Sequence, residues 1–451
     1  MNDLRALSNG IDEQPVIIPV EPFISPEYAR AEGEKLWAKV WQAACRLEEI
    51  PKVGDYVTYD ILDESIIVVR TAADRIAAYY NVCQHRGRRL TKGCGHTSKF
   101  YCRFHGWSWD IDGRNTFVLD REDWGDTLDD DAIRLKAVQV DCWGGWVWIN
   151  MDPDCEPLRE YLEPVATKLN PFELDRMRYR WRQWLRFPCN WKTAIGAFIE
   201  GYHAPASHPH LLRGGQGIRG LCRAQGRHAS HGSAGLRGGD GKPVGGVTSA
   251  RGRPDLDPRV AVAEDLAMVW ETLNSVTTET FVNAASRLVD ELPPGTSMEE
   301  VGRHLMVSAK RDDASRGVIW PEIDPAYLAE HSAIWHIFAN TIMILGLTTA
   351  LCYRARPDGY DPDSCIFEVY VIERFPEGRE PKTEWVHAPE PSKENWRLVL
   401  SQDFQNMPEV QKGMKSRGFS GARPNPVQED TVTHFHRTLA EYMGTGAPEP
   451  I

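Results

Sequence analysis

Two short segments of this chain carry side chains that bind metals. Residues 83–85 read Cys-Gln-His, and residues 102–105 read Cys-Arg-Phe-His. Two thiolates and two imidazoles can hold one zinc ion in a tetrahedral site, or a [2Fe–2S] cluster in which two histidines replace two of the usual cysteines. Zinc fingers group their cysteines in one pair and their histidines in another, whereas each half here mixes the two. The mixture favours the cluster, with ligands Cys83, His85, Cys102 and His105.

The residues around these ligands resemble a known family. Residues 81–89 read Asn-Val-Cys-Gln-His-Arg-Gly-Arg-Arg, and residues 101–113 read Tyr-Cys-Arg-Phe-His-Gly-Trp-Ser-Trp-Asp-Ile-Asp-Gly. Both resemble the cluster loops of the large, or alpha, subunits of Rieske non-haem iron oxygenases, the ring-hydroxylating dioxygenases. The resemblance implies a Rieske [2Fe–2S] cluster, whose reduction potential of roughly −150 to +300 mV suits electron transfer to an oxygen-activating metal. Cys94 and His96, in a glycine-rich stretch between the loops, are expected to be loop residues without a ligand role.

A second group of potential ligands follows in residues 190–209, where His203 and His208 are five residues apart. In a continuous helix five residues rotate a side chain by about 140°, so both imidazoles would not reach one ion. We therefore expect a helix that ends near Pro205, with His203 on its last turn and His208 returning toward the same metal. Two histidines and one carboxylate form the facial triad of non-haem Fe(II) oxygenases, which leaves open positions for O2 and substrate.

The resemblance also implies the third ligand. In the family, a segment beginning Asn-Trp-Lys precedes the two histidines, and the carboxylate is an Asp on a distant helix with a Gln eight residues later. Residues 190–192 match the first feature, and Asp403 with Gln411 matches the second. The alternatives are His210 for a histidine and Glu429 or Asp430 for the carboxylate.

Glu200 occupies the position at which most family members carry Asp. The resemblance implies that this carboxylate joins His105 of one subunit to His203 of its neighbour, and such a carboxylate orients imidazoles and raises their basicity. Members with Glu here include demethylases of quaternary ammonium compounds. Gly196 stands where the family often has Asn, so a polar contact is missing or replaced.

Composition excludes several classes of function. The net charge of −12 disfavours duplex nucleic acid as a partner, because phosphate binding needs clustered Lys and Arg. The ten cysteines are scattered, which favours a reducing cytoplasm over a secreted disulfide scaffold. The amino terminus has no apolar signal core and no apolar run is long enough to cross a bilayer, so a soluble protein with no membrane contact is expected.

The 451 residues suggest two or three domains. We expect an N-terminal helical segment at 1–40 that packs on the catalytic domain, a Rieske domain at 41–160 and a catalytic domain at 161–451. Residues 211–257 are rich in Gly, Arg, Ser and Pro and are expected to form a long loop; their G-x-G-x-x-G at 215–220 lacks the flanking strand and helix of a dinucleotide site. Strands are expected at 55–60, 65–70, 76–80, 138–150, 348–354 and 365–373, with helices at 25–40 and from 392 onward.

The resemblance covers nearly the whole chain and implies an α+β fold, with an antiparallel β Rieske domain and a helix-grip (SRPBCC-like) catalytic domain. It implies a homotrimer, with or without a small β subunit, that hydroxylates a small organic molecule with O2 at a mononuclear Fe(II). The family's commonest target is an aromatic ring. Electrons would come from NADH or NADPH through a separate reductase, with or without a ferredoxin. The alternatives are a monooxygenase that performs O- or N-demethylation, and a Rieske electron carrier without oxygenase activity.

Overall fold

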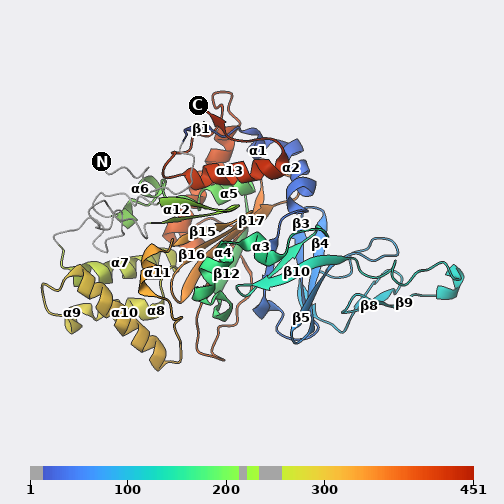
Figure 1. Ribbon diagram of the computed structural model, residues 1–451, viewed down its shortest axis with the longest axis horizontal. Coiled ribbons are helices and arrows are strands. Elements are labelled where there is room, and N and C mark those ends of the chain that lie inside the picture. Colours follow the sequence, from blue (N-terminus) through green and yellow to red (C-terminus); the bar gives the residue numbers. More distant parts are fainter. Residues whose placement is uncertain (1–13, 213–220, 233–255) are drawn as a thin grey trace. The chain divides into compact units, whose positions relative to one another are not determined.

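The structure is a computed structural model that describes residues 14–212, 221–232 and 256–451 (Figure 1). The chain divides into two compact units. One comprises the residues up to Ala29, Glu163–Pro357 and Asp361–Ile451, and the other comprises Arg30–Leu162 and Asp358–Tyr360. Each unit is described by itself.

The smaller unit is built on an antiparallel seven-stranded sheet, ordered β2-β11-β10-β5-β4-β3-β6. Its interior strand β4 contains the β-branched run Ile66 to Val69, whose side chains are all fully buried, as expected for a strand covered on both faces. The bounds are β2 Gln42–Arg46, β3 Asp55–Ile61, β4 Glu64–Ala72, β5 Arg75–Tyr80, β6 Cys94–His96, β10 Ala137–Trp143 and β11 Trp146–Asn150. The expected strands at 55–60, 65–70 and 76–80 are confirmed, whereas the expected strand at 138–150 is divided into β10 and β11 by a turn at Gly144 and Gly145.

A second sheet of three strands, β7 Lys99–Tyr101, β8 Ser108–Asp110 and β9 Asn115–Phe117, carries the second cluster loop between β7 and β8. One hydrophobic core lies under both cluster loops and includes Cys83, Cys102, Trp107 and Trp109. The remaining elements are α2 Pro26–Glu32, which contains the boundary between the units, the π-helix Gly33–Trp37, the 3₁₀ helices Leu47–Glu49 and Arg121–Trp124, and α3 Leu158–Leu162.

The larger unit is built on an eight-stranded sheet, ordered β13-β14-β15-β16-β17-β18-β12-β19. Neighbouring strands are antiparallel except for the short β19, which runs parallel to β12. The expected strands at 348–354 and 365–373 are confirmed as β17 and β18. The bounds are β12 Arg178–Phe187, β13 Leu221–Gln225, β14 His228–Gly232, β15 Ile334–Ile337, β16 Thr341–Leu345, β17 Thr349–Pro357, β18 Cys365–Glu373 and β19 Val386–His387, with a separate pair β1 Val16–Ile17 and β20 Glu449–Pro450.

Two C-terminal helices cover one face of this sheet. Phe404 of α12 (Lys393–Met414) contacts Phe187 of β12 and Phe367 of β18, at ring centroid distances of 5.0 and 5.7 Å. Phe435 of α13 (Asp430–Met443) contacts His336 of β15 at 5.3 Å. A long helix held against a curved antiparallel sheet agrees with the expected helix-grip architecture, and the helical pattern from residue 392 onward is confirmed.

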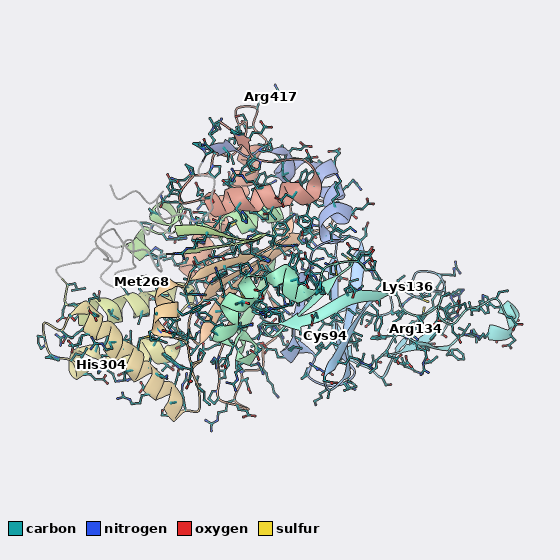
Figure 2. The ribbon with its side chains drawn as sticks, viewed as in Figure 1. Cys94, Arg134, Lys136, Met268, His304 and Arg417 are labelled. Carbon is teal, nitrogen blue, oxygen red and sulfur yellow. The ribbon has the colours of Figure 1, made fainter. Side chains whose placement is uncertain are left out.

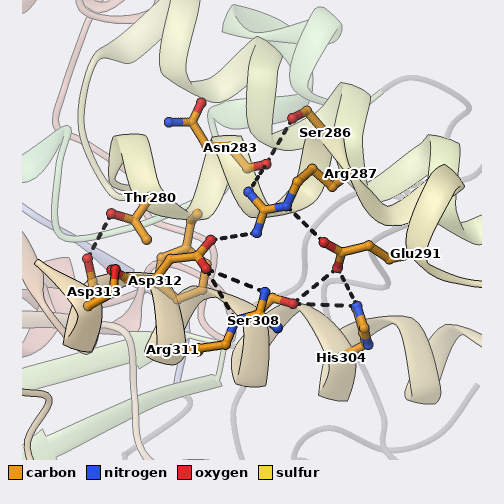
Figure 3. A network of polar contacts seen from close by, with 12 residues as sticks. Thr280, Asn283, Ser286, Arg287, Glu291, His304, Ser308, Arg311, Asp312 and Asp313 are labelled. Atoms are coloured by element: carbon orange, nitrogen blue, oxygen red, sulfur yellow. Dashed lines mark hydrogen bonds and ion pairs between the residues drawn. The ribbon is translucent and has the colours of Figure 1, made fainter.

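Helices between β14 and β15 pack around a core of their own. These helices are linked by a partly buried polar network in which Arg287 pairs with Glu291 and Asp312, while Glu291 also accepts from His304 and Ser308 (Figure 3). His304 and Met268 mark two of these helices in Figure 2. The helix bounds are α7 Pro258–Leu273, α8 Glu279–Ser286, α9 Leu288–Glu291, α10 Met298–Ser315 and α11 Pro325–Glu330. Elsewhere in the larger unit are α1 Glu21–Ile24, α4 Val165–Leu169, α5 Trp191–Gly196, α6 Ala204–Ser207, and the 3₁₀ helices Asn170–Phe172, Leu174–Arg176 and Pro209–Leu212.

The expectation of a loop over 211–257 is wrong in its centre. β13 and β14 form a hairpin there, joined by a turn at Gly226, whose φ of +65° suits glycine. The strands escaped notice because Arg, Gln, His and Ser give them no apolar alternation; pairing of β14 with β15 places them in the sheet instead. The G-x-G-x-x-G sequence at 215–220 lies outside the described residues. None of the described helices is both long and apolar enough to cross a membrane.

Candidate metal centres

The two cluster loops share one backbone design. In the first, Cys83 N–H donates to Arg88 O at 2.9 Å and Gly87 N–H donates to Cys83 O at 3.0 Å. In the second, Cys102 N–H donates to Trp107 O at 2.8 Å and Gly106 N–H donates to Cys102 O at 2.9 Å. The two glycines have φ of +76° and +79°, a region that other residues rarely adopt. Each loop thus holds its Cys and His at the tip of a tight turn.

The four expected cluster ligands lie together. The two sulfurs are buried, with Cys83 3% and Cys102 1% exposed, and burial together with the neighbouring Cys102 thiol raises the pKa of Cys83. The rings of His85 and His105 lie 4.6 Å apart, and His85 stacks on Trp107 at 4.9 Å. The Nδ1 atoms of both histidines are buried and have no hydrogen-bond partner. Buried nitrogens without partners are costly unless a metal occupies them, so this donor set fits a mixed-ligand cluster.

The arrangement disfavours a single zinc ion at the same place. Among the described residues, only His203, His208 and Asp403 bring three His, Cys or carboxylate ligand atoms within 4.8 Å of one another. The sulfur and nitrogen atoms of Cys83, His85, Cys102 and His105 do not converge in this way. Four ligands that are shared between two irons do not have to meet at one point. Cys94 and His96 belong to strand β6 rather than to a loop, and the His96 ring pairs with Asp55 at 2.9 Å (Cys94 is labelled in Figure 2).

The dihistidine segment folds differently from the expectation. Helix α5 ends at Gly196, well before His203. A separate short helix, α6, begins at Ala204, directly after His203. Pro205 lies in the first turn of α6, where its missing N–H costs nothing, so it starts a helix instead of ending one. His203 and His208 are the residues that flank α6 at its two ends. This break brings their rings to 5.4 Å of each other.

Asp403 of α12 completes the group. Its Oδ1 lies 2.8 Å from His208 Nε2 and 3.6 Å from His203 Nε2. Asp403 is 6% and His208 3% exposed. Two imidazole nitrogens and one carboxylate oxygen converging at this range match the donor set of the 2-His-1-carboxylate Fe(II) site.

The other nitrogen of each histidine has a partner that orients the ring. His203 Nδ1 lies 2.5 Å from Glu200 Oε1, and His208 Nδ1 lies 2.9 Å from Gln402 Oε1. Glu200 Oε2 accepts the backbone N–H groups of Tyr202 and His203. Such partners fix the tautomer so that the opposite nitrogen faces the metal. The sequence does not predict this role of Gln402; its only mark there is that it directly precedes Asp403.

Negative charge surrounds this site. Burial opposes protonation of His203, but the hydrogen bond to Glu200 and the charges of Asp403 and Glu429 outweigh it and raise the pKa of that imidazole. Burial and the charge of Glu200 raise the pKa of Glu429. The site therefore favours a cation, whether a metal ion or a positively charged ligand.

The alternative ligands are not part of the converging group. His210 lies beyond His208, with the ring centroids 6.2 Å apart, and Glu429 and Asp430 lie at the start of α13. A side chain added at Gly196 would meet no atom within 4 Å, so the place of the usual Asn is open space. Two clefts of ≈ 450 and ≈ 530 Å³ lie elsewhere in the larger unit, beside Arg397 and beside His434 respectively, and neither includes these ligands.

Residues 174–445 match the family described as the ring hydroxylating alpha subunit (catalytic domain), and residues 40–118 match the Rieske [2Fe–2S] domain. The chain belongs to the ring hydroxylating alpha subunit family. The family implies a Rieske cluster and a mononuclear iron as cofactors, and the two donor sets described above fit them. The expectations for the family, the fold and both cofactors are confirmed.

Several characterised proteins are similar over part of their length. The carnitine monooxygenase oxygenase subunit of Escherichia coli K12 is 31% identical over 195 residues, which are 43% of this chain and 52% of that protein. The glycine betaine monooxygenase oxygenase subunit of Chromohalobacter salexigens is 33% identical over 43% of each chain. The anthranilate 1,2-dioxygenase large subunit of Acinetobacter baylyi is 30% identical over 41% of each. The match thus spans about half the length of these relatives or less.

Solved structures share the fold over nearly the whole chain. A quaternary ammonium Rieske monooxygenase in complex with L-carnitine has a TM-score of 0.63 at 17% identity, covering 96% of both chains. Naphthalene 1,2-dioxygenase with bound indole has a TM-score of 0.62 at 17% identity, covering 96% of this chain and 93% of that one. At this identity the likeness shows the fold, and the substrate must be argued from the site.

Proposed function

We propose that this chain is the terminal oxygenase component of a Rieske monooxygenase that hydroxylates a carbon bound to a quaternary nitrogen. The observation that carries the proposal is the convergence of His203, His208 and Asp403 in a setting that is otherwise acidic. The similarity to carnitine and glycine betaine monooxygenases supports this substrate class. Glu at position 200 supports it too, because members with Glu there include demethylases of such compounds.

In this proposal Cys83, His85, Cys102 and His105 hold the cluster, and His203, His208 and Asp403 hold the iron. When bound, the cluster supplies single electrons and the iron supplies the place where O2 is activated. Glu200 and Gln402 keep the two imidazoles in the orientation that binding requires. A quaternary ammonium group has no N–H to donate, so negative charge and aromatic faces are the features that recognise it. Glu200 and Glu429 supply such charge.

The overall reaction uses one O2, two electrons and two protons, and it yields one hydroxylated carbon and one water. A hydroxyl on a carbon next to a quaternary nitrogen is unstable, because the C–N bond then breaks to release an amine and an aldehyde. Demethylation is the case in which the aldehyde is formaldehyde. The electrons would come from a separate NAD(P)H-dependent reductase, with or without a ferredoxin. We also propose a homotrimer, with or without a β subunit. We propose a cytoplasmic location as well, because none of the ten cysteines, all of them in the described residues, forms a disulfide.

The protein loaded with iron and cluster should be supplied with a competent reductase and offered carnitine, glycine betaine and choline beside anthranilate and naphthalene. We expect a quaternary ammonium compound to release an amine and an aldehyde, with one oxygen atom of labelled O2 in the aldehyde and the other in water, and with one O2 consumed for each product formed. Turnover of anthranilate or naphthalene to a diol alone would support the second candidate, aromatic ring hydroxylation, which the anthranilate dioxygenase similarity favours. Oxidation of the cluster without any product would leave only the electron-carrier alternative.

A further inference from the structure

A buried histidine of the large sheet, His231, lies beside the dihistidine segment. It belongs to strand β14, is 4% exposed, and its Nε2 is buried without a hydrogen-bond partner among the described residues. A Cβ added at Gly201 would lie 4.0 Å from that nitrogen. His231 therefore faces the segment that contains Glu200 and His203. The charge of Glu200 raises the pKa of His231, and that of His203 lowers it.

Strand register places His231 on the same face of the sheet as the aromatic residues near the iron ligands. Ala229, two residues before His231 on β14, pairs with His336 of β15. His336 pairs with Ile342 of β16, and Ile342 pairs with Tyr353 of β17. Directly paired residues share a face, and so do residues two apart. Tyr353 stacks on Phe198, with the ring centroids 4.3 Å apart. Burial and the charge of Asp403 raise the pKa of the Tyr353 phenol. One sheet face thus presents Tyr353 and His231 toward the dihistidine segment, which itself contributes Phe198.

The imidazole of His231 is neutral near pH 7, since burial lowers its pKa to about 4. A neutral imidazole carries one N–H donor and one acceptor nitrogen. Leaving such a group buried and unpaired costs free energy, and each case in a native protein needs an explanation. The other histidines of the site avoid this cost, because His203 and His208 are paired on Nδ1 and face the proposed metal with Nε2. In the part of the chain that the structure describes, the Nε2 of His231 has no such partner.

We infer that His231 is a specificity-determining residue whose imidazole hydrogen-bonds an oxygen of the substrate, most simply a carboxylate, while the quaternary nitrogen lies toward the acidic residues. The inference deepens the proposed function and rests on it for the cationic end of the substrate. Glu200, Glu429 and Asp403 would repel an isolated carboxylate, so the ligand should be a zwitterion or carry its oxygen on a spacer. Among the described residues no group bonds the Nε2 of His231, so this nitrogen is left to accept or donate such a bond.

The test measures binding without turnover. Iron-loaded, oxidised protein is titrated by calorimetry with glycine betaine and with tetramethylammonium, which has the cation but no carboxylate. We expect His231→Phe to raise the Kd of glycine betaine by roughly 10-fold to 100-fold, the range for a lost hydrogen bond to a charged group, and that of tetramethylammonium by less than twofold. His231→Gln, which keeps a donor, should recover most of the loss. Iron content, the Rieske spectrum and the melting temperature should match the unmodified protein.

A second variant leaves His231 in place. Gly201→Ala puts a methyl group 4.0 Å from Nε2 of His231, an ordinary contact distance. This variant should weaken the binding of glycine betaine more than the binding of tetramethylammonium. Equal weakening of both ligands in His231→Phe and in Gly201→Ala would indicate a structural role and overturn the inference, as would no weakening of either. If no quaternary ammonium compound is turned over but anthranilate binds better than aniline in a His231-dependent way, the proposed function fails, while the hydrogen bond from His231 to a substrate carboxylate stands. If the unmodified protein binds neither carboxylate, the inference fails.

Discussion

The side chain of Gln411 joins the helix that carries Asp403 to the start of the dihistidine segment. Its Oε1 accepts the backbone N–H of Asn190 at 3.1 Å and the hydroxyl of Thr193 at 3.0 Å. Its Nε2 donates to Asp363 Oδ1 at 2.9 Å, and the residue is 2% exposed. The Asn-Trp-Lys motif and the Gln that follows the ligand Asp, widely separated in the sequence, are thus two halves of one contact.

Replacing Gln411 with Leu should lower the free energy of unfolding of the larger unit by about 2–3 kcal/mol, because it leaves the Asn190 N–H buried without a partner. The affinity for iron should fall as well, because Gln411 would no longer hold α12, and with it Asp403, against the start of the dihistidine segment. Urea unfolding and iron titration measure the two effects. Lys412→Gln, at an exposed neighbouring residue, should change stability by less than about 0.5 kcal/mol. Similar stability of both variants would show that the contact is not needed.

Cys83→Ala or His105→Ala should remove the low-average-g EPR signal that the reduced protein gives through mixed His and Cys ligation. Each change deletes one of the four donors to the two irons, while the mononuclear site lies in the other unit. Cys94→Ala is the matched control, because this exposed cysteine of β6 should leave the signal unchanged. A colourless protein with stoichiometric zinc would contradict the cluster assignment.

His203→Ala, His208→Ala and Asp403→Ala should each abolish product formation and mononuclear iron binding, yet leave the Rieske spectrum intact. The three atoms that converge within 4.8 Å lose one member in each variant. Iron content by mass spectrometry and EPR of the cluster separate the two metals. His210→Ala should be far milder. Iron and activity retained in Asp403→Ala would move the carboxylate ligand to another residue.

Glu200→Gln should keep both metals and the oligomer but lose most turnover. The amide oxygen can still accept from His203 Nδ1, at the position where Glu200 Oε1 now lies 2.5 Å away, but the negative charge that strengthens this hydrogen bond is gone. The predicted bridge to His105 of a neighbouring copy would be lost with it. Single-turnover oxidation of the reduced cluster measures the coupling, and a rate equal to that of the unmodified protein would exclude a route through Glu200.

Acid should destabilise the larger unit through Glu368. Burial would raise the pKa of this carboxyl, but Arg354 and Arg356 outweigh burial and lower it from its ordinary 4.5 to about 2. A depressed pKa contributes stability that is complete above pH 4.5 and is lost as the pH falls toward 2. Glu368→Gln, which leaves Arg354 without its 2.5 Å ion pair, should cost about 3 kcal/mol at pH 7 and much less at pH 3. Denaturant unfolding at both pH values checks this, and a pH-independent loss would contradict it.

The cluster loops could be predicted from the sequence because their design is local. Cys83 and Cys102 each bond with residues no more than five positions away, and Gly87 and Gly106 supply the left-handed turns, so the ligand pattern and the backbone that forms it lie within a few letters of each other. The central strands of both sheets were predictable for a similar reason, since runs of β-branched residues identify buried strands without knowledge of their partners.

The mononuclear site depended on tertiary structure. Asp403 reaches His208 across almost two hundred residues, and only the family resemblance pointed to it, because an Asp on a helix has no local mark of metal binding. The break between α5 and α6 was placed wrongly from Pro205, since a proline can start a helix as well as end one. His231 and the β13–β14 hairpin were missed because their strands have no apolar alternation. Long-range pairing in the sheet placed them, and such pairing cannot be found from the neighbouring residues.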